Sequence, residues 1–136
     1  SAGDVVINEI MWMGSFTDPI DEWVELRNTT GEDITLSGCV LENAAQGFSS
    51  LVFPSGSIIP AGGYFLISNF DKDNAQSSLN IDGDWVTSLL SLNNGNNGSL
   101  VLMCSNSVVD SALNANSDHW PAGARCCTSC RFRWPN

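Results

Sequence analysis

Positive charge is scarce in this chain of 136 residues: five Lys and Arg residues stand against fifteen Asp and Glu residues, for a formal net charge of −10. Clustered Lys and Arg side chains supply most of a protein's affinity for a phosphate backbone. We therefore expect no nucleic acid binding by the folded domain. The exclusion is weaker near the C-terminus, where Arg125, Arg131 and Arg133 lie close to Phe132 and Trp134.

Side chains typical of catalytic sites are also scarce. The single histidine is His119 and the single lysine is Lys72. No serine lies in a Gly-x-Ser-x-Gly turn, and no Gly-x-x-x-x-Gly-Lys phosphate loop is present. The sequence therefore predicts a protein that is not an enzyme and that has no catalytic residues.

Long apolar runs and helical periodicity are missing as well. No apolar run approaches the roughly 20 residues of a membrane-spanning helix, so we expect no transmembrane segment. No window keeps apolar residues at helical spacing over three turns. Short runs of Val, Ile, Leu and aromatic residues alternate instead with Gly, Asn, Ser, Thr and Asp, which is typical of short strands joined by turns.

These runs predict an all-β protein. The expected strands lie at residues 5–11, 22–28, 34–41, 51–53, 57–59, 64–68, 85–87, 100–104 and 108–112. Val24 and Leu26 should share one face of their strand, with Trp23, Glu25 and Arg27 on the other. The glycine-bearing segment 93–98 is typical of a hairpin loop. About eight or nine short strands favour a β-sandwich, because two sheets can cover each other's apolar faces.

The composition changes after residue 113. Residues 114–136 hold three of the four arginines, three of the five cysteines and two of the five tryptophans. We therefore expect one domain over residues 1–113, followed by an irregular extension over residues 114–136. Cys126, Cys127, Cys130 and His119 could in principle supply four zinc ligands, although adjacent cysteines make tetrahedral geometry awkward. Intermolecular disulfide formation is the alternative, since five is an odd number of thiols.

Two further cysteines, Cys39 and Cys104, fall in expected core strands. Their separation is compatible with a disulfide between the two sheets of the sandwich. Two buried free thiols fit the sequence equally well. Both alternatives stay open at this point.

The order of the segments carries a resemblance to a known family. The segments are residues 5–10 (VVINEI), 21–28 (DEWVELRN), 33–38 (DITLSG), the proline and glycine turns at 53–54 and 59–64, and the strands at 89–92, 98–102 and 109–111. This order resembles lamin tail domains, especially bacterial members, over about residues 4–113. One departure is Cys39, where the family often has tryptophan after Ser-Gly.

The resemblance implies an immunoglobulin-like β-sandwich that acts as a non-catalytic interaction module. We accordingly expect an accessory domain of a secreted or surface bacterial protein that recognises a protein or a cell-envelope component, as a monomer or weak oligomer. One alternative is a structural module of a filament-type protein, which would be nuclear. Another is a calcium-stabilised adhesive domain.

The carboxylates and surface aromatics supply the candidate site residues. Asp71, Asp73, Asp82 and Asp84 lie in turn-like segments whose oxygens could bind calcium, although the complete EF-hand pattern is missing. Glu9, Glu22 and Glu25 could act in acid–base chemistry or hold a metal, but a structural role is the simpler interpretation, with Glu25 in a cross-strand ion pair. Trp12, Phe16 and Trp85 are candidate binding residues near loops. Asn28 and Asn97 begin glycosylation sequons.

Overall fold

The computed structural model describes residues 1–92 and 99–112. Ten β-strands and one short 3₁₀ helix, η1, form in this part of the chain. They are β1 (Val5–Met11), β2 (Trp23–Asn28), β3 (Ile34–Thr35), β4 (Val40–Ala45), η1 (Gln46–Phe48), β5 (Ser49–Val52), β6 (Ile58–Ile59), β7 (Tyr64–Ser68), β8 (Trp85–Val86), β9 (Leu100–Cys104) and β10 (Ser107–Ala112).

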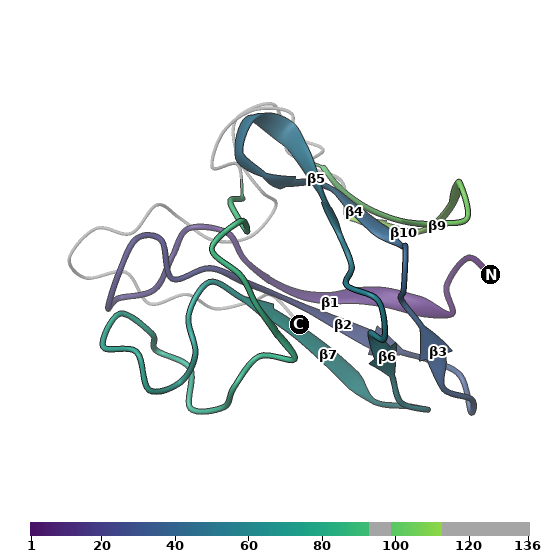
Figure 1. Ribbon diagram of the computed structural model, residues 1–136, viewed down its shortest axis with the longest axis horizontal. Coiled ribbons are helices and arrows are strands. Elements are labelled where there is room, and N and C mark those ends of the chain that lie inside the picture. The colour runs from purple at the N-terminus through teal and green to yellow at the C-terminus, as the bar shows by residue number, and fades with distance from the viewer. Residues whose placement is uncertain (93–98, 113–136) are drawn as a thin grey trace.

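The strands form two facing sheets with a small third pair (Figure 1). One sheet has the order β1-β2-β7-β8 and the other the order β10-β9-β4-β5, while β3 pairs with β6. Neighbouring strands are antiparallel except for β7 and β8, which are parallel. The all-β, immunoglobulin-like sandwich expected from the sequence is confirmed.

Alternation of side chains along β2 shows how the sequence builds the core. Val24 and Leu26 are fully buried and pair with Ile67 and Phe65 of β7. Arg27, on the opposite face of β2, is exposed. Because successive residues of a strand point to opposite faces, β2 contributes one apolar row to the space between the sheets.

The expected strand over residues 34–41 is two strands in the structure. Gly38 has φ +75°, a left-handed conformation that only glycine adopts readily, and it turns the chain between β3 and β4. Leu36 at this turn is fully buried. A second turn, at Ser105 and Asn106, has φ +51° and +60° and joins β9 to β10 as a two-residue hairpin.

The two cysteines of the described chain form a disulfide. Cys39 and Cys104 are joined with an S–S distance of 2.09 Å. Cys39 directly precedes β4 and Cys104 is the last residue of β9; these strands are neighbours in one sheet, where Val40 pairs with Met103 beside the bridge. The expectation of a bridge between the two sheets is therefore wrong, because it assumed that the two cysteine strands lay in different sheets.

Asn28, at the end of β2, joins three parts of the fold. Its Nδ2 donates to the backbone oxygens of Glu32 (2.7 Å), Pro60 (3.0 Å) and Ile59 (3.1 Å). Its Oδ1 accepts hydrogen bonds from the backbone N–H and the hydroxyl of Thr30. The residue is fully buried, so its amide nitrogen is not accessible for glycosylation in the folded chain.

The two sheets are bonded to each other directly at one edge of the sandwich. At the first edge, Gly3 N donates to Val109 O (2.8 Å), and Ile7 N of β1 donates to Asp110 Oδ2 of β10 (2.7 Å). The other edge strands, β8 and β5, end their sheets on the opposite side. The sandwich is therefore closed at β1 and β10 and has a second edge at β5 and β8.

Several expectations concern residues outside the described part of the chain. They are the hairpin loop at 93–98, the sequon at Asn97, and the zinc ligands and basic residues of the extension over residues 114–136. In the described ranges, no helix is long and apolar enough to cross a membrane.

Candidate functional site

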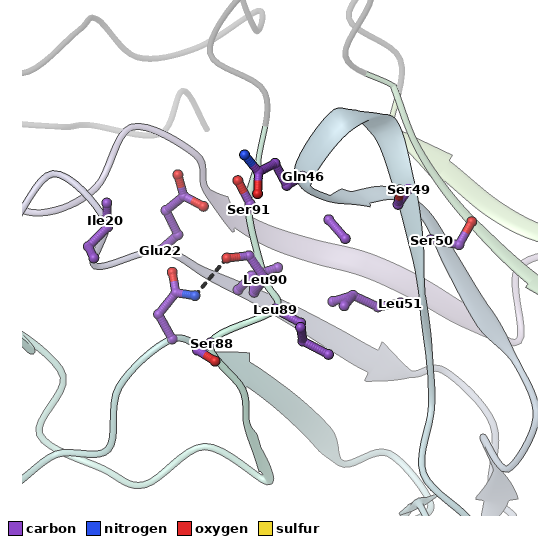
Figure 2. A pocket seen from close by; sticks show the side chains of 12 residues that line it. Ile20, Glu22, Gln46, Ser49, Ser50, Leu51, Ser88, Leu89, Leu90 and Ser91 are labelled. Atoms are coloured by element: carbon purple, nitrogen blue, oxygen red, sulfur yellow. Dashed lines mark hydrogen bonds between the residues drawn. The ribbon is translucent and has the colours of Figure 1, made fainter.

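A half-open cleft of 630 Å³ lies at the edge where β5 and β8 end their sheets. Its apolar lining includes Ile20, Leu51 and Leu89, and its polar lining includes Gln46, Ser49 and Ser91. Figure 2 shows Ile20 and Glu22 on one side, with Gln46, Ser49 and Ser50 on the other. The cleft is thus built from segments of both sheets.

Residues 87–92 form the floor of the cleft by crossing from one sheet to the other. Thr87 N donates to Ser68 O of β7 at 2.8 Å, and Ser91 N donates to Ala44 O of β4, also at 2.8 Å. Leu90 and Leu92 are buried in the core. These two leucines anchor the crossing segment in the core. Residues 88–91 of the segment line the cleft.

Glu22, directly before β2, places a carboxyl group in this cleft although its side chain is only 6% exposed. Its Oε2 accepts a hydrogen bond from Leu92 N at 2.8 Å. Burial disfavours the charged form and raises the pKa of Glu22 to about 8, against a smaller lowering by the Leu92 hydrogen bond. The carboxyl group is therefore mostly protonated at neutral pH.

Asn69, after β7, brings a second oxygen to the cleft. Its Nδ2 donates to Leu90 O at 2.7 Å, the dashed contact in Figure 2, and to Thr87 O at 3.2 Å. Its Oδ1 is buried and accepts no hydrogen bond from the residues the structure describes. A buried oxygen without a hydrogen-bond donor lowers the stability of the fold. Asn69 Oδ1 is therefore an atom to which a ligand could usefully donate a hydrogen bond.

The cleft offers one ionisable group rather than a pair. Glu22 is the single titratable side chain among the described residues that line it. General acid–base catalysis by two carboxyl groups needs two such groups, and a nucleophile needs a neighbouring base. The described lining therefore holds neither of these catalytic arrangements.

The neighbouring Asp21 is structural. It is fully buried, and its Oδ2 accepts from Ser78 N at 2.8 Å and from Ser78 Oγ at 2.9 Å. Nearby, Gln76 Nε2 donates to Asp18 Oδ2 at 2.7 Å. These bonds hold the loop between β7 and β8 against the loop between β1 and β2. They thereby fix the backbone next to Glu22.

The three aromatic residues predicted to bind a partner do not come together at the cleft. Trp12 is 1% exposed and belongs to the core, so the expectation that it lies on the surface is wrong. Trp85 is half-buried, with its ring centroid 5.4 Å from that of Phe53. Phe16 is 82% exposed. A binding role for Phe16 and Trp85 stays a prediction.

Glu9 and Glu25 pair across β1 and β2, and among the described residues Glu25 does not form the cross-strand ion pair expected of it. Asn8 Nδ2 donates to Glu25 Oε1, and Trp23 Nε1 donates to Glu9 Oε1, each at 2.7 Å. Arg27 lies over the Tyr64 ring instead, 5.8 Å from its centroid. The expected cross-strand ion pair of Glu25 is therefore replaced by a hydrogen bond to a neutral amide.

The four aspartates predicted to bind calcium each accept hydrogen bonds from the loop between β7 and β8 or from β7 itself. Asp84 Oδ2 accepts from Leu66 N and Asp82 Oδ1 accepts from Lys72 N. Asp71 Oδ1 accepts from Asp73 N, while Asp73 also pairs with Lys72 Nζ at 2.9 Å. Within residues 1–92 and 99–112, no three His, Cys, Asp or Glu side chains gather as a metal site.

The geometry therefore gives the calcium hypothesis no support, and it stays a prediction. A rise in melting temperature in millimolar calcium would favour it. An unchanged melting temperature would reject it.

The sequence singled out Glu22 but missed its surroundings. Asn69, Gln46 and the serines at positions 88 and 91 carry no motif, and their meeting depends on the crossing of residues 87–92 between the sheets. The one signal for this site in the sequence was the acidic residue directly before the apolar alternation of β2, Glu22. Its buried carboxyl group depends on a hydrogen bond from Leu92, which lies seventy residues further along the chain.

Comparison with known families agrees with this architecture. The model of the lamin tail domain matches residues 1–114, which is most of the chain. No curated protein matches it. With its sandwich topology and its family match, the chain belongs to the lamin tail domain family, a family of immunoglobulin-like, non-catalytic domains.

Proposed function

We propose that this domain is a non-catalytic protein interaction module of a secreted or surface protein, and that it docks an extended segment of its partner in the cleft between β5 and residues 88–91. The observation that carries the proposal is the exposed apolar rim of this cleft. Ile20 is 57% exposed and Leu89 is 65% exposed, and both line it.

The position of the cleft supports an extended partner. β5 is the last strand of its sheet, and Ser49, Ser50 and Leu51 of this strand line the cleft. An edge strand presents unpaired backbone groups on which an extended peptide can add as a further strand. The opposite edge of the sandwich offers less of this opportunity, because Asp110 Oδ2 of β10 accepts from Ile7 N of β1 and Val109 O accepts from Gly3 N.

The disulfide supports a location outside the reducing cytosol. Disulfides such as Cys39–Cys104 persist in secreted and surface proteins and are rare in reducing compartments. A small acidic domain with a closed core and one open edge fits an accessory module joined to other domains. The proposed partner is therefore a protein encountered in an oxidising compartment or at the cell envelope.

Selection from a random peptide library tests this function and does not require the partner to be identified first. The native chain, a Leu89→Asp variant and an Ile58→Asp variant are each used as bait. Ile58 is a matched control because it is 54% exposed and apolar but lies on β6, outside the cleft. We expect peptides that bind the native chain and the Ile58→Asp variant and that lose affinity for the Leu89→Asp variant.

Two results would reject the proposal. One is the absence of enriched peptides on the native chain. The other is equal loss of binding in the Leu89→Asp and Ile58→Asp variants, which would show that the peptides do not use the cleft.

A further inference from the structure

We propose that the cleft takes one basic side chain of the docked partner, a lysine or an arginine, and places its cationic group against the carboxyl of Glu22 and the Oδ1 atom of Asn69. This inference rests on the proposed function and names the chemistry by which the same cleft selects its partner.

Once Glu22 is ionised, the polar groups of the cleft that lack donors are acceptors. Leu92 N is the one described donor to the Glu22 carboxyl, and it bonds to Oε2. Oδ1 of Asn69 is buried with no described donor. The backbones of these two residues are bonded, since Asn69 N donates to Glu22 O at 3.1 Å, so the two acceptors project from adjacent positions. A ligand rich in N–H donors satisfies both.

Buried carboxyl groups need a partner charge or a proton, and no described residue offers the charge here. Arg27 lies over Tyr64, and Lys72 pairs with Asp73. The other groups that line the cleft from η1, β5 and residues 88–91 are neutral. No charged or titratable side chain contributes to the pKa of Glu22, which is shifted by burial and the Leu92 hydrogen bond.

The whole domain favours a cation over an anion at this place. Residues 1–113 carry fourteen acidic residues against Arg27 and Lys72, a formal net charge of −12. Such a field attracts basic segments and repels acidic ones during encounter. A metal ion fits less well, because the described residues hold no group of three His, Cys, Asp or Glu side chains around the carboxyl.

Docking of the basic side chain is therefore coupled to the release of a proton from Glu22. In the free domain Glu22 is mostly protonated at neutral pH, because its pKa is about 8. When the cation arrives, the carboxyl group becomes the better partner as a carboxylate, and its proton goes to solvent. Lysine and arginine keep their charge up to about pH 10, so the pH dependence below that belongs to Glu22.

The test uses four peptides that differ at one central residue: lysine, arginine, acetyl-lysine or norleucine. Each is titrated calorimetrically into the native chain, a Glu22→Gln variant and a Glu32→Gln variant. Glu32 is the matched control, because its side chain is exposed on a turn outside the cleft. Repetition in buffers of different ionisation enthalpy counts the protons released.

We expect the lysine or the arginine peptide to bind the native chain and the Glu32→Gln variant, and to bind at least about tenfold more tightly near pH 8 than near pH 6. Binding at neutral pH should release close to one proton. Glu22→Gln should weaken binding by at least about tenfold near pH 8 and remove both the pH dependence and the proton release.

Three results would overturn the inference. The first is equal binding of the norleucine or acetyl-lysine peptide, which would leave the apolar docking of the proposed function intact. The second is binding that Glu22→Gln does not change, or no binding by any of the four peptides. The third is binding that appears only after Arg125, Arg131 and Arg133 are replaced with glutamine, which would show that the cleft takes the chain's own arginines.

Discussion

At the residue scale, Glu22 and Asn28 show two outcomes for a buried polar side chain. All hydrogen-bonding groups of Asn28 have partners, which ties β2 to the turns after it. The Glu22 carboxyl has a single described donor and keeps its proton instead. The sequence predicts neither the full hydrogen bonding of Asn28 nor the burial of Glu22. Both residues lie at the ends of a predicted strand, residues 22–28, in which polar and apolar residues alternate.

The first prediction concerns the pH dependence of stability. The folded chain holds the Glu22 proton more tightly than the unfolded chain, because burial raises the pKa from 4.5 to about 8. The contribution of Glu22 to the free energy of unfolding is therefore complete below about pH 4.5 and is lost as the pH rises to about 8. Glu22→Gln should remove this loss and stabilise the chain near pH 8 by a few kcal/mol, with little effect near pH 5.

Urea unfolding of the native chain and the Glu22→Gln variant at both pH values measures this effect. Glu32→Gln is the control and should follow the native chain at each pH. A Glu22→Gln variant that is destabilised equally at both pH values would show that the carboxyl group is not buried in its protonated form.

The second prediction concerns Asn28. Replacement by alanine removes the buried amide that donates to three backbone oxygens and accepts from Thr30, so the free energy of unfolding should fall by about 2–4 kcal/mol. Asn8→Ala is the control, because Asn8 makes one exposed hydrogen bond, to Glu25, and its loss should cost less than about 1 kcal/mol. Equal effects of the two substitutions in urea unfolding would contradict the bonding scheme of Asn28.

At the scale of the elements, strands with strong local patterns were predictable and their partners were not. The bounds of β1, β7 and β9 agree with the sequence prediction, because each is a short run dominated by apolar residues. The break at Gly38 was missed, since its left-handed φ depends on the turn that buries Leu36. The sheet to which each strand belongs is a property of long-range pairing, which explains the error over the disulfide.

The third prediction concerns the disulfide between β4 and β9. It closes a loop over a sequence separation of 65 residues, and its removal by Cys39→Ala with Cys104→Ala should lower the free energy of unfolding by about 2–4 kcal/mol. The measurement is made in a chain whose cysteines at 126, 127 and 130 are serine, so that no other thiol contributes. In that background, a reductant that leaves the unfolding midpoint of the parent unchanged would contradict the bridge.

At the scale of the whole molecule, the cleft is a consequence of how the sandwich closes. Bonding between β1 and β10 joins the sheets at one edge. The other edge is spanned by residues 87–92, and this crossing segment both buries Glu22 and exposes Leu89. The sequence could predict the sandwich and its acidity, but not this cleft, because its residues come from several separated segments without a shared motif.

The central claim is that partner segments dock in the cleft between β5 and residues 88–91. The most direct measurement is an amide chemical-shift map of the isotope-labelled chain, titrated with a peptide selected from the library. The account predicts that the largest shift changes fall on residues 20, 22, 45, 46, 49–51, 69 and 88–91, which line the cleft. Changes centred on β3 and β6, or on the closed edge of β1 and β10, with the cleft residues unmoved, would contradict it.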